Sequence, residues 1–168
     1  RRDKNDGTGL YSAIEYHFRT LQAATLAGVN YKDEQKQAFQ DLIRDIEKGL
    51  MATAINYMYT TTDKLTKTNP SDADLASALH DLSEAISFVY GFKELNNVNI
   101  QITPAQVQEI MDLLEFGGTE NGFYHFVKEP VKYLPQILEA QNKLKEIYQF
   151  SGSEMNDFRN NWVSVQGR

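Results

Sequence analysis

The sequence predicts an all-α protein, an antiparallel helical bundle of about five to six helices joined by short irregular loops. Apolar residues recur at helical spacing through several long segments, and residues that favour helix ends stand at the borders of these segments. The alternation typical of strands is confined to NVNIQI at 97–102, with a possible strand from Val98 to Ile102. One short strand cannot form a sheet alone, so a bundle is the expected architecture.

The first two helices are expected from about Leu10 to Ala27 and from about Glu34 to Thr60 or beyond. Gly28 is a natural stop for the first helix because glycine readily adopts a left-handed conformation. Asp33 is the expected N-cap of the second helix, since its carboxylate can accept hydrogen bonds from the free amides of the first turn. The apolar stripes are Tyr11, Ile14, Phe18 and Leu21 in the first helix, and Phe39, Leu42, Ile43, Ile46, Leu50, Tyr57 and Met58 in the second.

Start signals mark the remaining helices. Ser71 is the expected N-cap of a third helix from Asp72 to Phe92, and Thr103 followed by Pro104 starts a fourth that ends at the glycines 117 and 118. A fifth helix is expected from Pro135 to about Ile147. The segment FYHFVKEP at 123–130 is expected to form a short helix or an aromatic plug, and a last short segment runs from 153 to near 162.

Residues 1–9 are expected to form a flexible N-terminal tail, and residues 10–168 a single helical-bundle domain. A chain of 168 residues can bury a real core, but its opening RRDKNDGTG has neither an initiator Met nor a signal peptide, which predicts a fragment of a longer chain. The stretch DKNDGTG has the composition of a calcium loop, but Lys4 would hold the first ligand position and repel the ion.

Composition excludes several function classes. The net charge of −6 argues against nonspecific nucleic-acid binding, and no apolar run approaches the length of a transmembrane helix. The absence of cysteine excludes disulfides and thiol chemistry, which suits the cytosol and the periplasm alike. The metalloprotease motif HExxH, the phosphate loop and the GxSxG elbow are also absent, so the domain is expected to be noncatalytic.

His80 and Glu84 are the candidate metal ligands. They stand four residues apart in the third helix, so both project from one side and could share a cation. The alternative is an exposed pair that contributes a few tenths of a kcal/mol. A metal site needs about three or four ligands, and Glu15 or His17 is a further candidate by residue type. Such a site would hold a divalent metal or iron through nitrogen and oxygen ligands.

Tyr124 and His125 are candidates for ligand or partner contact. They lie in the aromatic run FYHF at 123–126. An aromatic-rich loop can stack on a ligand, and the alternative is packing over the end of the bundle.

Four segments carry a resemblance to a known family: AIEYHFRTLQAA, INYMY, ALHDLSEAISFVYGF and ITPAQVQEIMDLL, within residues 10–117. They resemble the C-terminal half of an uncharacterised family of bacterial extracytoplasmic lipoproteins from marine Bacteroidetes and Gammaproteobacteria. That family is similar to the imelysin-like group, which includes metallopeptidase and iron-uptake proteins. The imelysin His-x-x-Glu motif is shifted here, because Ser83 follows His80 at that offset and the acid comes at Glu84. The resemblance therefore implies fold and compartment but carries over no peptidase activity.

The expected function is that of a noncatalytic extracytoplasmic binding or scaffold domain of a bacterial lipoprotein. The alternatives are an imelysin-like metal-binding module, for iron capture or peptide hydrolysis, and a structural subunit of a larger assembly. The expected partner is a missing N-terminal half or another protein that covers the long second helix and the Phe88 side of the third. A lipid anchor would lie outside this segment.

Overall fold

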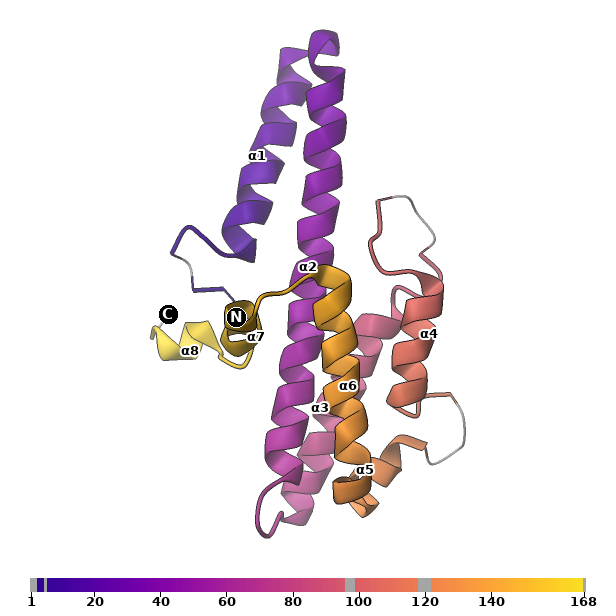
Figure 1. The fold of residues 1–168 in the computed structure, drawn as a ribbon. Helices are drawn as coiled ribbons and strands as arrows, with labels where there is room; N and C mark the ends of the chain where they lie inside the picture. The colour runs from indigo at the N-terminus through magenta and orange to yellow at the C-terminus, as the bar shows by residue number, and fades with distance from the viewer. Residues whose placement is uncertain (1–2, 5, 96–98, 118–121, 168) are drawn as a thin grey trace.

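The computed structural model describes residues 3–4, 6–95, 99–117 and 122–167. It is 76% helix without strands in these ranges, which confirms the predicted all-α class. Five of the described helices have ten or more residues, and short helical turns connect or follow them (Figure 1). The long helices are α1 (Leu10–Ala27), α2 (Lys32–Leu65), α3 (Asp72–Tyr90), α4 (Pro104–Leu113) and α6 (Pro130–Tyr148). The short ones are η1 (Val29–Tyr31), η2 (Gly122–Tyr124), α5 (His125–Lys128), α7 (Gly152–Asp157) and α8 (Trp162–Val165).

The bounds of α1 agree with the prediction, and α2 differs from it at its start. Gly28 ends α1 with a φ of 90°, as expected for a glycine stop. The prediction of Asp33 as N-cap is wrong, because η1 leads directly into α2 and Asp33 lies in its first turn. Helix α2 ends at Leu65, within the predicted range of Thr60 or beyond, and the hydroxyls of Thr61 and Thr62 donate to backbone carbonyls of the preceding turn. With 34 residues α2 is about 50 Å long.

Capping boxes start α3 and α4 where the sequence places them. Ser71 accepts a hydrogen bond from the amide of Asp74, whose side chain accepts from Ser71 in return. Thr103 and Gln106 make the same reciprocal pair before α4. The expected strand is not formed at 99–102, and Val98 lies outside the described residues. The Glu47 carboxylate accepts hydrogen bonds from the backbone amides of Gln101 and Ile102. These amides are therefore satisfied by a side chain of α2 and not by a second strand.

The start of α6 is a correction to the sequence analysis. The helix begins at Pro130, and Pro135 lies inside it. Proline fits the first helical position at either site, so the sequence offered two possible starts. The last predicted segment is divided into α7, capped by Ser151, and α8, which begins at Trp162.

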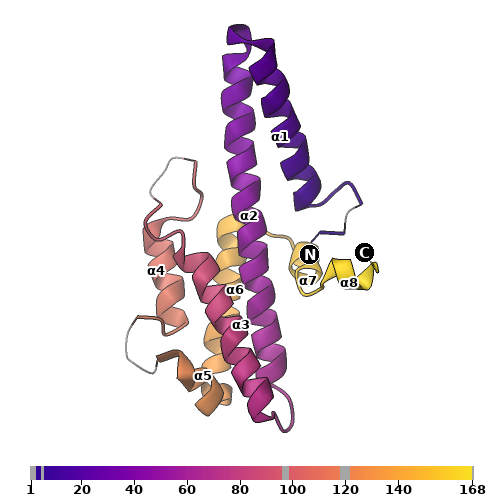
Figure 2. The ribbon, with the colours of Figure 1, turned by 180° about the vertical axis from the view of Figure 1, so that it is seen from behind.

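The second half of α2 is the central element of the core. Met51, Ile55 and Met58 are fully buried there, and α3 and α6 pack against this half (Figures 1 and 2). By contrast, α1 packs mainly on the first half of α2, and the two helices project together beyond the rest of the bundle. We call residues 10–50 the arm. The molecule thus consists of a bundle and a two-helix projection.

Candidate functional site

His80 and Glu84 lie on the exposed side of α3. Their side chains are 69% and 39% exposed, and His80 Nε2 stands 3.9 Å from Glu84 Oε1. An exposed pair at this separation contributes little to stability. Among the described residues, no group of three or more His, Asp and Glu side chains could hold a metal ion. The metal role of His80 and Glu84 stays a prediction.

Glu15 and His17 point to different partners, as their spacing requires. Glu15 pairs with Arg19 on the surface of α1 at 2.5 Å. His17 faces α2, where its Nδ1 lies 2.8 Å from Oδ2 of the buried Asp45. This contact joins α1 to α2. Among the described residues, the ion pairs of Glu15 and His17 are with Arg19 and Asp45, and the ion pair of His80 is with Glu84.

Tyr124 and His125 lie at the junction of η2 and α5. His125 Nδ1 is 2.5 Å from Glu115 Oε2, and the ring stacks on Tyr133 with centroids 5.1 Å apart. Tyr124 stacks on Phe123 and is 42% exposed. These contacts are those of an aromatic segment packed beside α6, and a role for the two residues in partner contact stays a prediction.

A buried carboxylate that sequence reasoning missed organises the centre of the fold. Glu47 is 1% exposed, and its Oε1 accepts a hydrogen bond of 2.6 Å from the Tyr148 hydroxyl. The amides of Gln101 and Ile102 donate to the same carboxylate at 2.9 Å each. Burial, and then the bond to Glu47, raise the pKa of Tyr148 well above its usual value. Glu47 thereby ties α2 to α6 and to the segment before α4.

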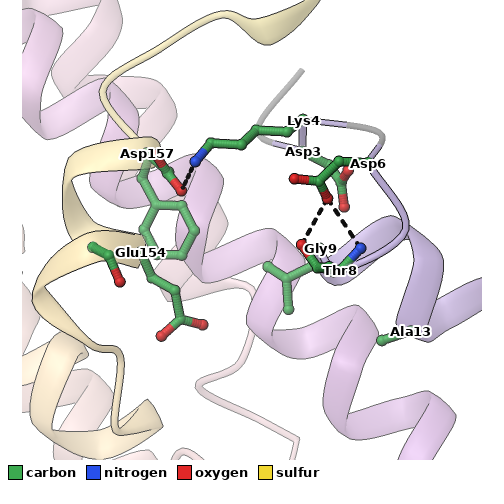
Figure 3. Close-up of a pocket in the computed structure, with 11 residues that line it drawn as sticks. Asp3, Lys4, Asp6, Thr8, Gly9, Ala13, Glu154 and Asp157 are labelled. Carbon is green, nitrogen blue, oxygen red and sulfur yellow. Dashed lines mark hydrogen bonds and ion pairs between the residues drawn. The ribbon is translucent and has the colours of Figure 1, made fainter.

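The N-terminal segment and α7 line a cavity of about 310 Å³ (Figure 3). Lys4 bridges it with an ion pair of 2.8 Å to Asp157. Asp6 accepts hydrogen bonds from the amide and hydroxyl of Thr8, which lower its pKa. Glu154 and Ser151 form a reciprocal capping box at the start of α7, with Ser151 as the N-cap. Lys4, Asp6 and Glu154, which line the cavity, thus each bond to another residue. The flexibility expected for residues 1–9 stays a prediction.

The arm exposes much more apolar surface than the bundle does. Of fifteen exposed large hydrophobic residues in the described chain, eight belong to the arm. In α1, only Ala24 is buried. The eight are Tyr11, Tyr16, Phe18, Leu26, Val29, Tyr31, Phe39 and Ile46.

Four of these eight side chains, Tyr11, Phe18, Phe39 and Ile46, fall on one side of the arm. Tyr11 and Phe18 are rotated by about 100° from the α1 row that contacts α2, and Phe39 and Ile46 by a similar angle from the α2 row that contacts α1. The two helices run in opposite directions, so rotations in the same sense reach the same face of the hairpin. We call this the arm face; it comprises Tyr11, Phe18, Phe39, Ile43, Ile46 and Leu50.

A cavity of about 350 Å³ at the foot of the arm continues the arm face toward the bundle. Tyr11 and Ile14 of α1 line it together with Gly49, Thr53 and Tyr57 of α2. The opposite side of α2 is polar, where Asp41 accepts hydrogen bonds from Gln37 and Arg44. The arm is therefore apolar on one face and polar on the other.

The Phe88 side of α3, which a partner was expected to cover, is in contact with other parts of the bundle. Phe92 is buried in the core, and Phe88 stacks on Tyr57 with centroids 6.0 Å apart. The open apolar surface lies on the arm instead.

Comparison with known proteins gives a family for the chain. Neither the curated proteins nor the solved structures contain a significant match. No described helix is long and apolar enough to cross a membrane. The family model of a domain of unknown function, DUF4856, matches residues 1–151, which is most of the chain. The chain therefore belongs to the DUF4856 family.

Proposed function

We propose that this domain is a noncatalytic helical binding domain that uses the arm face to bind another protein. The observation that carries the proposal is the exposure of Tyr11, Phe18, Phe39 and Ile46 on one side of a two-helix projection. Clustered exposed apolar side chains mark interaction surfaces on soluble proteins. Aromatic residues are also enriched at the centres of protein interfaces, where they contribute much of the binding energy.

The proposal includes an extracytoplasmic location as part of a bacterial lipoprotein. Its support is the sequence resemblance carried by residues 10–117. Fractionation of cells that express the native protein tests this part separately. A lipoprotein is expected in the membrane fraction and in the detergent phase, and recovery with the cytosolic proteins would contradict the location without affecting the arm face.

Metal binding receives no comparable support. His80 and Glu84 have exposed side chains and no third acidic or histidine ligand grouped with them in the described residues. The imelysin-like assignment would require additional ligands. A scaffold role in a larger assembly, in contrast, is compatible with the arm face, because both roles use a protein–protein interface.

Site-specific photo-crosslinking in living cells tests the binding role. A benzoylphenylalanine placed at Phe18 or Phe39 of the native protein is expected to capture a protein. The matched control is Tyr16, which is also aromatic and exposed but lies on the other flank of α1. Equal capture at 16 and 18, or none at 18 and 39, would overturn the proposal.

A further inference from the structure

The face of α2 that α1 and the bundle leave partly uncovered has the spacing of a coiled-coil seam, although Leu50 and Tyr57 on it also pack against the core. Its members follow one another at intervals of four, three, four, three and four residues, which is the a/d repeat of helices that pack on a partner helix. None of the six is buried in the described structure, and two of them are exposed. This α2 seam consists of Phe39, Ile43, Ile46, Leu50, Thr53 and Tyr57.

Each neighbouring helix covers only part of the α2 seam. α1 contacts the adjacent row, through Ile14 near Gly49 and His17 at Asp45. Phe88 of α3 covers the end of the α2 seam at Tyr57. In Figure 2, α1 lies beside the first half of α2 and α3 beside its second half. Along the seam row from Phe39 to Ile46 there are therefore apolar residues with no helix packed on them, whereas Leu50 packs in part against the core.

We propose that the arm face, together with the rest of the α2 seam, binds the same surface of a second copy of this chain and forms an intermolecular four-helix bundle. The inference rests on the proposed binding role and names its partner. A two-fold axis makes the contact self-complementary, because the same apolar surface of each copy covers that of the other. Both two-fold arrangements of the face-to-face arms give each helix an antiparallel neighbour, the usual geometry of four-helix bundles.

Charge on the arm is compatible with pairing of like chains. The arm carries six acidic and five basic residues, so it holds only −1 of the net charge of −6. The positions that flank the α2 seam are 40, 42, 47, 49, 54 and 56, and Glu47 is the only charged residue among them. That carboxylate is buried and bonded to Tyr148, so like charges do not meet along the α2 seam.

The available apolar area matches that of a stable dimer. The exposed fractions of Tyr11, Phe18, Phe39 and Ile46 together amount to two whole side chains. At about 200 Å² for a large side chain, this is about 400 Å² of apolar surface per copy. A standard interface buries about 800 Å² per partner, a little over half of it apolar. The arm face therefore supplies about the apolar area that a stable interface requires.

Sedimentation velocity of the purified protein tests the pairing. We expect a dimer at micromolar concentration and a shift to monomer for Phe39→Glu and for Ile46→Glu. Each substitution would bury an unpaired carboxylate in the interface, and the dissociation constant should rise about tenfold or more. Tyr16→Glu adds the same charge on the other flank and should remain dimeric. Circular dichroism of each variant shows whether the helices have formed.

The outcomes separate this inference from the proposed binding role. A wild-type protein that stays monomeric at about 100 µM, far above the micromolar range of specific association, overturns self-pairing. Crosslinks from Phe18 and Phe39 to a different protein would still uphold the binding role. A dimer that resists Phe39→Glu and Ile46→Glu, with folding intact, also contradicts the inference because its interface must lie elsewhere.

Discussion

Single buried polar side chains connect segments of this fold that are far apart in sequence. Glu47 is the clearest case, because three hydrogen-bond donors from two other segments converge on its carboxylate. Asn56 acts similarly, donating from its side-chain amide to the carbonyl of Phe158 at 2.6 Å. A buried carboxylate requires partners for its oxygens, so these contacts fix where the C-terminal half of the chain packs on α2.

Tyr148→Phe is expected to destabilise the fold by about 1.5 to 3 kcal/mol at neutral pH, because it removes a hydrogen bond to a buried charged group. The pKa of Tyr148 is raised in the folded state, so above pH 10 the unfolded chain loses this proton first. Wild-type stability should then fall by up to about 1.4 kcal/mol per pH unit, and Tyr148→Phe should lack that component. Urea unfolding at several pH values measures both effects.

The half-exposed Tyr124 provides the control for this experiment. Tyr124→Phe should unfold at nearly the wild-type urea concentration and retain the alkaline loss of stability. Equal pH dependence of wild type and Tyr148→Phe above pH 10 would contradict the role assigned to the Tyr148–Glu47 bond.

Helix starts were predictable from the sequence wherever the capping residues act locally. Ser71 and Thr103 each bond within three residues of themselves, so short-range spacing is sufficient to identify them. Glu47 was not predictable, since its partners lie 54, 55 and 101 residues away and nothing nearby distinguishes it from a solvent-exposed acid. Whether Pro130 or Pro135 starts α6 was likewise not decided by local preference, because both satisfy it.

The apolar stripe on α2 shows that the sequence alone could not tell the buried side of this helix from its exposed side. The sequence analysis grouped Leu42 with Phe39, Ile43 and Ile46, because all four are apolar and helically spaced. The structure separates them: Leu42 is buried toward α1, and the other three belong to the exposed side. The intervals of four and three residues from Phe39 to Tyr57 were the signal for the α2 seam, and the position of α1 was needed to recognise that it is uncovered.

Ser71→Ala is expected to destabilise the protein by about 1 kcal/mol, because the first turn of α3 loses the acceptor for one of its free amides. Asp74 is the second residue of this capping box, and hydrogen bonds from Lys67 and then from Ser71 lower the pKa of its carboxyl group. Thermal unfolding measures the change. Ser87→Ala removes a hydroxyl from the last turn of α3 without removing the N-cap, and it should leave the stability within about 0.5 kcal/mol. Equal effects of the two substitutions would argue against the cap.

The whole molecule combines parts with different amounts of buried surface. The second half of α2 is enclosed by other helices, with Met51, Ile55 and Met58 fully buried. The arm is a hairpin in which α1 and the first half of α2 cover each other, and Glu47 at its foot also contacts α6 and residues 101–102 (Figure 1). Local opening costs less free energy where fewer apolar contacts must be broken. The arm is therefore expected to be the less stable part of an isolated chain.

Amide hydrogen exchange should detect this difference along the single helix α2. In the monomer, amides of α1 and of residues 35–46 should exchange at least about a hundredfold faster than those of residues 51–62, because opening the arm leaves the core intact. The change should occur beyond Gly49, because Tyr11 and Ile14 of α1 still lie beside Gly49 and Thr53 of α2. Raising the protein concentration should protect the arm selectively if its face pairs with a second copy, whereas the core amides should not respond. Uniform protection along α2 in the monomeric Phe39→Glu variant would contradict the division into arm and bundle.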